Sequence, residues 1–100
     1  MVALNNHKFD GPKFPLGKLI CTEGAAELIT RLKIKIMNLI GRHITGDWGD
    51  IDDEDVHTNN CALLHGDRLL SSYNIDPVSK LWIITEADRS RTTILLPSEY

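Results

Sequence analysis

The feature that most constrains the fold is a change in hydrophobic period after Gly66. From there on, three runs rich in β-branched, aromatic and aliphatic residues follow one another, at 68–75, 81–88 and 91–97, and such runs are typical of strands. The polar connections between them are short, and Pro77 in the first suits the second position of a turn. Since short connections join antiparallel neighbours, we predict a three-stranded antiparallel meander.

The part of the chain before Gly66 shows helical spacing instead. Residues 18–21 can form a short strand, after which Thr22 is placed to cap a helix whose apolar residues fall on one face. The segment 33–44 begins with an alternating pattern, but its later apolar residues recur at helical spacing, so we predict a helix there.

A third helix is predicted over residues 52–65. Asp52 can cap its first turn, with Asp55 reaching back as in a capping box, and Gly66 supplies a left-handed stop. We expect one side of this helix to carry Val56, Asn60, Leu63 and Leu64.

These elements predict an α+β fold of two layers, with two to three helices on a three- to four-stranded antiparallel meander sheet. One hundred residues support a single core, which we assign to residues 18–100, and we expect a flexible N-terminal tail over residues 1–17. The net charge of −3 does not favour nucleic acid. No membrane span or signal peptide is recognised, so we expect a cytoplasmic protein.

The sequence offers little for a metal or a cofactor. Cys21 and Cys61 lie 40 positions apart, and we expect both to be reduced, small core residues. The acidic run at 47–55 does not fit the spacing of a calcium-binding loop, whereas carboxylates at a helix N-terminus are stabilised by the helix dipole. We therefore expect no metal and no cofactor.

The segment RHITGDWGD, residues 42–50, combines a histidine, carboxylates and a tryptophan where a helix ends. The helix terminus and Asp47 would both favour the charged form of His43. His43 is then either a general acid–base group or a structural residue hydrogen-bonded to the turn. Trp48 is predicted to anchor this turn to the sheet.

A second polar group lies in TEADRSRTT, residues 85–93, around one end of a hairpin. An arginine, a histidine, a glutamate and a hydroxyl are the groups that metal-free RNA cleavage requires. The alternative is a surface hairpin whose charges pair with one another. The two polar groups form one site only if the turn at 46–50 lies against this hairpin.

Three segments, RHITGDWGD, EDVHTNNCALLHGDRLLSSY and LWIITEADRSRTTILLPSEY, resemble a family of short proteins carried on bacterial plasmids and integrative elements. Members are often labelled plasmid-related or, loosely, type I restriction endonuclease subunit M. A methylation subunit, however, needs a cofactor-binding fold several times this size. The resemblance covers about residues 17–100 and implies a mobile-element protein without an established activity.

We expect a binding protein, an accessory factor of a mobile genetic element that contacts a host or element macromolecule. A protein partner is favoured, and countering a host defence fits the setting. The alternative is a metal-independent ribonuclease using His43 and Arg89, assisted by Glu86 or Thr92. A homodimer joined along the final strand is a third possibility. The candidate binding residues are Arg42, Asp47, Trp48, Asp50, Asn59, Thr85, Asp88, Thr93 and Tyr100.

Overall fold

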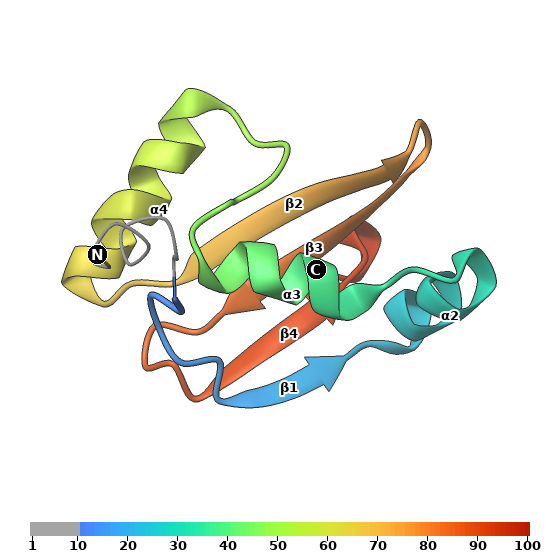
Figure 1. Ribbon diagram of the computed structural model, residues 1–100, viewed down its shortest axis with the longest axis horizontal. Coiled ribbons are helices and arrows are strands. Elements are labelled where there is room, and N and C mark those ends of the chain that lie inside the picture. The colour runs from blue at the N-terminus through green and yellow to red at the C-terminus, as the bar shows by residue number, and fades with distance from the viewer. Residues whose placement is uncertain (1–10) are drawn as a thin grey trace, which may run out of the picture.

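The computed structural model describes residues 11–100, which form a four-stranded sheet with three α-helices and a short C-terminal 3-10 helix (Figure 1). The elements in chain order are β1 (Lys18–Cys21), α2 (Glu23–Leu32), α3 (Ile36–Ile44), α4 (Asp53–His65), β2 (Leu69–Asp76), β3 (Ser79–Thr85), β4 (Arg91–Leu95) and η1 (Pro97–Glu99). The predicted α+β class is confirmed, with helices packed on a four-stranded sheet.

The sheet is mixed, with strand order β1-β4-β3-β2. The last three strands form the predicted antiparallel meander. β1 instead pairs in parallel with β4, Lys18 opposite Arg91, because the chain passes through all three helices and two strands before it returns to this edge. β4 therefore lies inside the sheet, which is incompatible with a dimer joined along the final strand. The edges are β1 and β2.

The ends of α2 and α3 follow local rules. The Thr22 hydroxyl accepts a hydrogen bond from the Ala25 amide (3.3 Å), which confirms the predicted cap. Lys33 adopts a left-handed conformation with φ of 56° and ends α2. Helix α3 then begins at Ile36, so the helix predicted over 33–44 starts three residues late, and the alternating residues at its start belong to the connection.

α4 begins and ends as predicted. The Asp52 carboxylate accepts a hydrogen bond from the Asp55 amide (2.8 Å), and Gly66 ends the helix with φ of 75°. Its Gly66 amide donates to the Ala62 carbonyl (2.9 Å), which satisfies one of the carbonyls that a helix terminus leaves open.

The predicted side of α4 is confirmed in part, since Val56 and Leu63 are half-buried against the core cluster that contains Trp48. The residues buried on this helix are Asn59 and Ala62, whereas Leu64 is 83% exposed. The reason is that α4 meets the sheet at the edge of β2 through a small residue and a polar one. Hydrophobic spacing does not indicate a contact of that kind.

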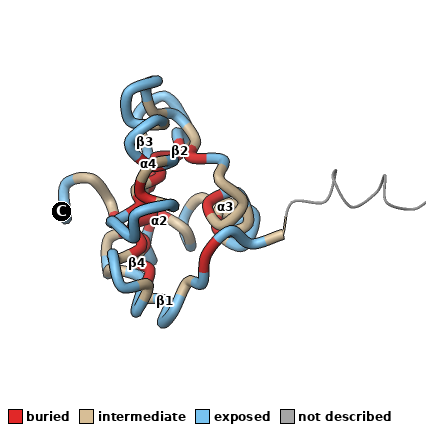
Figure 2. Tube along the Cα trace, turned by 90° about the vertical axis from the view of Figure 1, so that its left-hand side faces the viewer, coloured by how far each residue is buried: buried red, intermediate tan, exposed pale blue. Residues whose placement is uncertain are grey.

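Two clusters of buried residues make up the core. One lies between α2, α3 and the sheet and contains Ala25, Leu28, Ile40, Tyr73, Leu81, Ile83 and Ile94. The other lies toward α4 and contains Phe14, Trp48, Ala62 and Leu69. In Figure 2, α3 and the C-terminus lie on opposite sides of the sheet. Because side chains alternate along a strand, the sheet face away from α3, here called the outer face, carries Trp82 and Ile84 of β3.

The segment before β1 packs more closely than predicted. Residues 1–10 of the expected tail lie outside the described residues, but Phe14 is buried and the Lys13 amide donates to the Ile44 carbonyl (2.7 Å). The two cysteines are free but are not core residues, since Cys21 is exposed and Cys61 half-buried. Within residues 11–100, no helix has the length and apolar character needed to cross a membrane.

Candidate functional site

His43 lies in the last turn of α3 and is fully buried beneath the sheet. Its Nδ1 is 2.6 Å from the Ser71 hydroxyl of β2, and its Nε2 is 2.8 Å from the Thr85 hydroxyl of β3. The Thr85 hydroxyl is 2.7 Å from that of Thr92 on β4, which in turn donates to the Leu16 carbonyl (2.8 Å). A continuous chain of hydrogen bonds therefore links α3, three strands and the segment before β1.

The direction of each hydrogen bond in this chain follows from the Leu16 carbonyl, which can only accept. Thr92 donates its single hydroxyl proton to that carbonyl. The hydrogen bond between the two threonine hydroxyls is therefore donated by Thr85. Thr85 must then accept from Nε2–H of His43, and Nδ1 of a neutral ring accepts from Ser71. The network therefore fixes one proton on Nε2.

The expected charged form of His43 is wrong because the ring is buried away from water. Burial lowers the pKa of His43 to about 4, and the positive charge of Arg89 contributes in the same direction. Asp47 does not offset this, because its carboxylate is bound by Arg42 at the surface. With both ring nitrogens bonded and no exposed surface, His43 has the geometry of a structural residue rather than of an acid–base catalyst.

Arg89 is also engaged by the fold. Its Nη1 donates to the carbonyls of Asp67 (2.6 Å), Glu86 (3.0 Å) and Ala87 (3.2 Å), and its Nη2 donates to the carbonyl of Ala62 (3.2 Å). These bonds tie the β3–β4 turn to the last turn of α4 and to Asp67 just after it. The guanidinium proposed for phosphate binding is thus used to join two elements.

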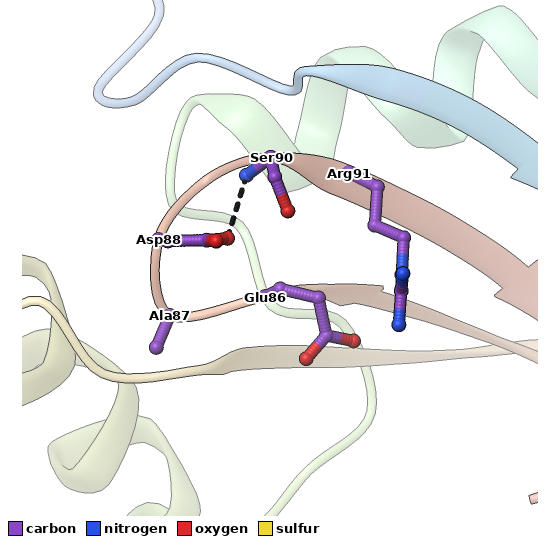
Figure 3. A pocket seen from close by; sticks show the side chains of 5 residues that line it. All are labelled: Glu86, Ala87, Asp88, Ser90 and Arg91. Carbon is purple, nitrogen blue, oxygen red and sulfur yellow. Dashed lines mark hydrogen bonds between the residues drawn. The ribbon is translucent and has the colours of Figure 1, made fainter.

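The turn of the β3–β4 hairpin is rich in polar side chains (Figure 3). Within it, the Ser90 amide donates to the Asp88 carboxylate (2.9 Å), and the pKa of Asp88 is held below its usual value by these hydrogen bonds to Ser90. The side chains of Glu86 and Arg91 extend from neighbouring strands to the same side of an open hollow of about 370 Å³. Glu86 does not approach His43 through any hydrogen bond among the described residues.

The turn at 46–50 does not lie against this hairpin but runs along the outer edge of β2. The Ser72 amide donates to the Trp48 carbonyl (3.1 Å), the Asp50 amide donates to the Ser72 carbonyl (2.6 Å), and the Asn74 amide donates to the Asp50 carboxylate (2.8 Å). Gly49 forms an isolated parallel bridge with Ser72 and has φ of 82°. A Cβ on Gly49 would collide with the Ser72 carbonyl, so glycine is required here.

The hydrogen bonds along the β2 edge, here called the edge cover, are extended to Leu70 by Asn59 on α4. Its side-chain amide donates to the Leu70 carbonyl (2.7 Å), and its side-chain oxygen accepts from the Leu70 amide (3.1 Å). The outward amides of residues 70, 72 and 74 are therefore all satisfied by side chains or by the 46–50 turn. An open edge strand is a template for pairing with another chain. Asn59 and the turn at 46–50 therefore protect the β2 edge from such pairing.

Arg42 and Asp47 hold the turn in place. The Arg42 guanidinium donates two hydrogen bonds to the Asp47 carboxylate (2.7 and 3.2 Å) and lies 4.7 Å from the centroid of the Tyr73 ring. The Tyr73 hydroxyl donates to the Asp47 carbonyl (2.7 Å). Trp48, buried as predicted, donates its indole N–H to the Asn60 side chain (3.1 Å).

The outer face carries a group of aromatic and basic side chains that no core cluster uses. The rings of Trp82 and Tyr100 are 5.6 Å apart at 67°, and the Arg68 guanidinium lies 5.4 Å from the Tyr100 ring and donates to its hydroxyl. Arg68, Trp82 and Tyr100 are here called the outer-face patch. A groove of about 380 Å³ beside it is lined by Asp55, Thr58, Asn59, Arg68, Leu70 and Trp82.

The structure therefore brings together His43, Thr85 and Thr92, but as a buried network. It separates them from the exposed carboxylates of Asp47 and Asp50. Thr93 is half-buried on the outer face opposite Ile84, and Tyr100 lies in the outer-face patch. Sequence reasoning missed Ser71 and Arg68. The signal for Ser71 was its position between Leu69 and Tyr73, because a polar residue at an inward strand position needs a buried partner.

Comparison of the chain with protein-family models, with curated proteins and with solved structures found no match.

Proposed function

We propose that the chain is a cytoplasmic accessory protein of a mobile genetic element that binds a partner protein through the outer-face patch. The observation that carries the proposal is the cluster of Arg68, Trp82 and Tyr100, of which Tyr100 is 65% exposed. Tryptophan, tyrosine and arginine are the residue types in which binding hot spots are enriched. The groove between α4 and the sheet gives such an interface a concave element.

The charges around the patch are of both signs, since Asp55 lines the groove with Arg68 and Glu86 lies beside Arg91. On the outer face, alternation places Lys18, Lys80 and Arg91 with Trp82, and all three cations are exposed. The chain as a whole has a net charge of −3, so attraction to a polyanion such as nucleic acid is weak at long range. A surface that carries charges of both signs suits a protein partner with complementary charges.

The mobile-element setting rests on the resemblance of the GDWGD and WIITEADRS segments to plasmid-borne proteins. In that setting we propose a host protein as the partner, with interference in a host defence as the role. The motif residues form hydrogen bonds within the fold, which supports a structural role for them. We therefore assign partner binding to the outer face.

The ribonuclease alternative gains no support from the geometry. His43 is buried with both nitrogens bonded, and Arg89 donates to four carbonyls. Phe14 lies against both groups, 5.2 Å from the His43 ring and 5.7 Å from the Arg89 guanidinium carbon, measured to the Phe14 centroid. An apolar ring thus occupies the position where a phosphate substrate would have to bind.

The proposal is tested by affinity purification from host cells with matched surface variants. Tyr100→Ala removes a side chain that is 65% exposed on the outer face, and Met37→Ala removes one that is 66% exposed on α3. Loss of a hot spot costs about 2 kcal/mol, or about thirtyfold in affinity. We therefore expect a protein recovered with the wild type and with Met37→Ala to be depleted with Tyr100→Ala and with Arg68→Glu.

Binding is then measured with the purified partner by calorimetry, with the same variants. Equal losses with Tyr100→Ala and Met37→Ala would contradict the assignment of the outer face. Recovery of RNA in place of a protein, abolished by Arg68→Glu, would replace the proposed partner class with nucleic acid.

A further inference from the structure

His57 and Cys61 lie one turn apart on α4, where side chains four residues apart share a face. The Nε2 atom of His57 is 3.5 Å from the Sγ atom of Cys61. His57 is exposed and Cys61 is a half-buried free thiol, and neither belongs to a core cluster. The sequence was expected to hold no metal, because it has no CxxC pair or close cluster of cysteine and histidine.

The spacing of the two donor atoms fits a tetrahedral metal ion. Zinc binds thiolate sulfur at about 2.3 Å and imidazole nitrogen at about 2.0–2.1 Å, so two such ligands at the tetrahedral angle lie about 3.5 Å apart. His57 Nε2 and Cys61 Sγ have this separation already. The pair can therefore bind an ion without a change in the helix backbone, which makes binding less costly in conformational entropy.

The surroundings suit a cation. The first turn of α4 carries Asp53, Glu54 and Asp55, and the first two precede His57 by four and three residues. Among residues 11–100 no group of three or more metal-ligating side chains comes together. One chain thus supplies two ligands, one fewer than in open zinc sites, and water can take the remaining positions.

We propose that His57 and Cys61 form a surface binding site for a thiophilic divalent cation of the zinc class. Cys61 binds as the thiolate and His57 binds through neutral Nε2, so that one proton leaves the thiol for each ion bound. Nitrogen and sulfur donors select zinc or cobalt over magnesium and calcium, which prefer oxygen ligands. This site is separate from the outer-face patch and does not depend on the proposed function.

The test is a titration of the reduced full chain with Co²⁺, followed by displacement with Zn²⁺. A His7→Gln background removes a histidine outside the described residues. Binding through Cys61 is expected to give cobalt–thiolate charge-transfer absorption that zinc abolishes. Loss of a residue that only orients a metal ligand weakens metal binding about 10- to 100-fold, so His57→Ala and Cys61→Ser, which remove a ligand, should each weaken it at least about tenfold.

Two matched variants serve as controls on the same titration. His65→Ala removes the other exposed histidine of α4, and Cys21→Ser removes the other thiol; both should bind cobalt like the wild type. Wild-type affinity in Cys61→Ser, or absence of the thiolate absorption in the wild type, would overturn the proposal. Circular dichroism of each variant shows that the helices remain folded, so that a loss of binding reports the ligands alone.

Discussion

Protonation of His43 should couple the stability of the fold to pH. The folded protein holds the pKa of His43 at about 4, against a usual value of 6.5. The unfolded chain therefore binds more protons between these values, and the free energy of unfolding must fall as the pH is lowered through this window. At about 1.4 kcal/mol per pH unit, the difference corresponds to about 3 kcal/mol between pH 7 and pH 4.

Carboxylates change the free energy of unfolding in a different range of pH. Hydrogen bonding from Arg42 lowers the pKa of Asp47 below its model-compound value of 3.8. Stability from such a group is complete above that value and is lost only as the pH falls through the folded pKa. Between pH 7 and pH 5 the decline should therefore belong to histidine.

The assay is urea unfolding followed by tryptophan fluorescence at several pH values between 7 and 5, with the wild type and two variants. His43→Leu replaces the imidazole with an apolar side chain and should remove the pH dependence. It should also lower stability at pH 7, because the Ser71 and Thr85 hydroxyls each lose a partner at about 1–3 kcal/mol. His57→Gln, at an exposed histidine, should keep the wild-type slope. An unchanged slope in His43→Leu would refute the reasoning.

Three further predictions concern the edge cover and the turn anchor, each measured by urea unfolding. Gly49→Ala should cost about 1–3 kcal/mol because of its positive φ and the collision with Ser72, whereas Gly41→Ala, with open space on α3, should stabilise by about 0.5–1 kcal/mol. Arg89→Ala removes four hydrogen bonds and leaves the carbonyls of Asp67 and Ala87 without this donor, and it should cost about 2–3 kcal/mol. Asn59→Leu exposes the β2 edge, so light scattering should show association as well as a loss of about 2 kcal/mol; a fully monomeric variant would contradict the role of this edge cover.

Local signals predicted the elements of the fold well. The change of period after Gly66 predicted the three meander strands, and the caps at Thr22 and Asp52 lie where side-chain chemistry placed them. Local signals could not predict the parallel pairing of β1 with β4. This pairing depends on the path of the chain through the helices, which is a property of the whole fold.

The arrangement of the candidate site was predicted less well than the elements of the fold. Sequence reasoning selected residues that do interact, such as His43 with Thr85 and Arg42 with Asp47. It could not tell that the first pair is buried and the second exposed, because the burial of the imidazole depends on Phe14, which packs on it from a distant segment, as well as on the neighbouring Trp48. The same residue types serve catalysis when they are open to a substrate and structure when they are enclosed.

The central claim is that the polar motif residues hold the fold, with a neutral imidazole at the centre of their hydrogen-bond network. Nitrogen-15 NMR of the His43 ring tests it most directly, through the protonation and tautomer of each nitrogen as a function of pH. We predict a neutral ring protonated at Nε2 from pH 7 down to pH 5. A ring that titrates near its usual pKa of about 6.5, or one that carries its proton on Nδ1, would contradict the account.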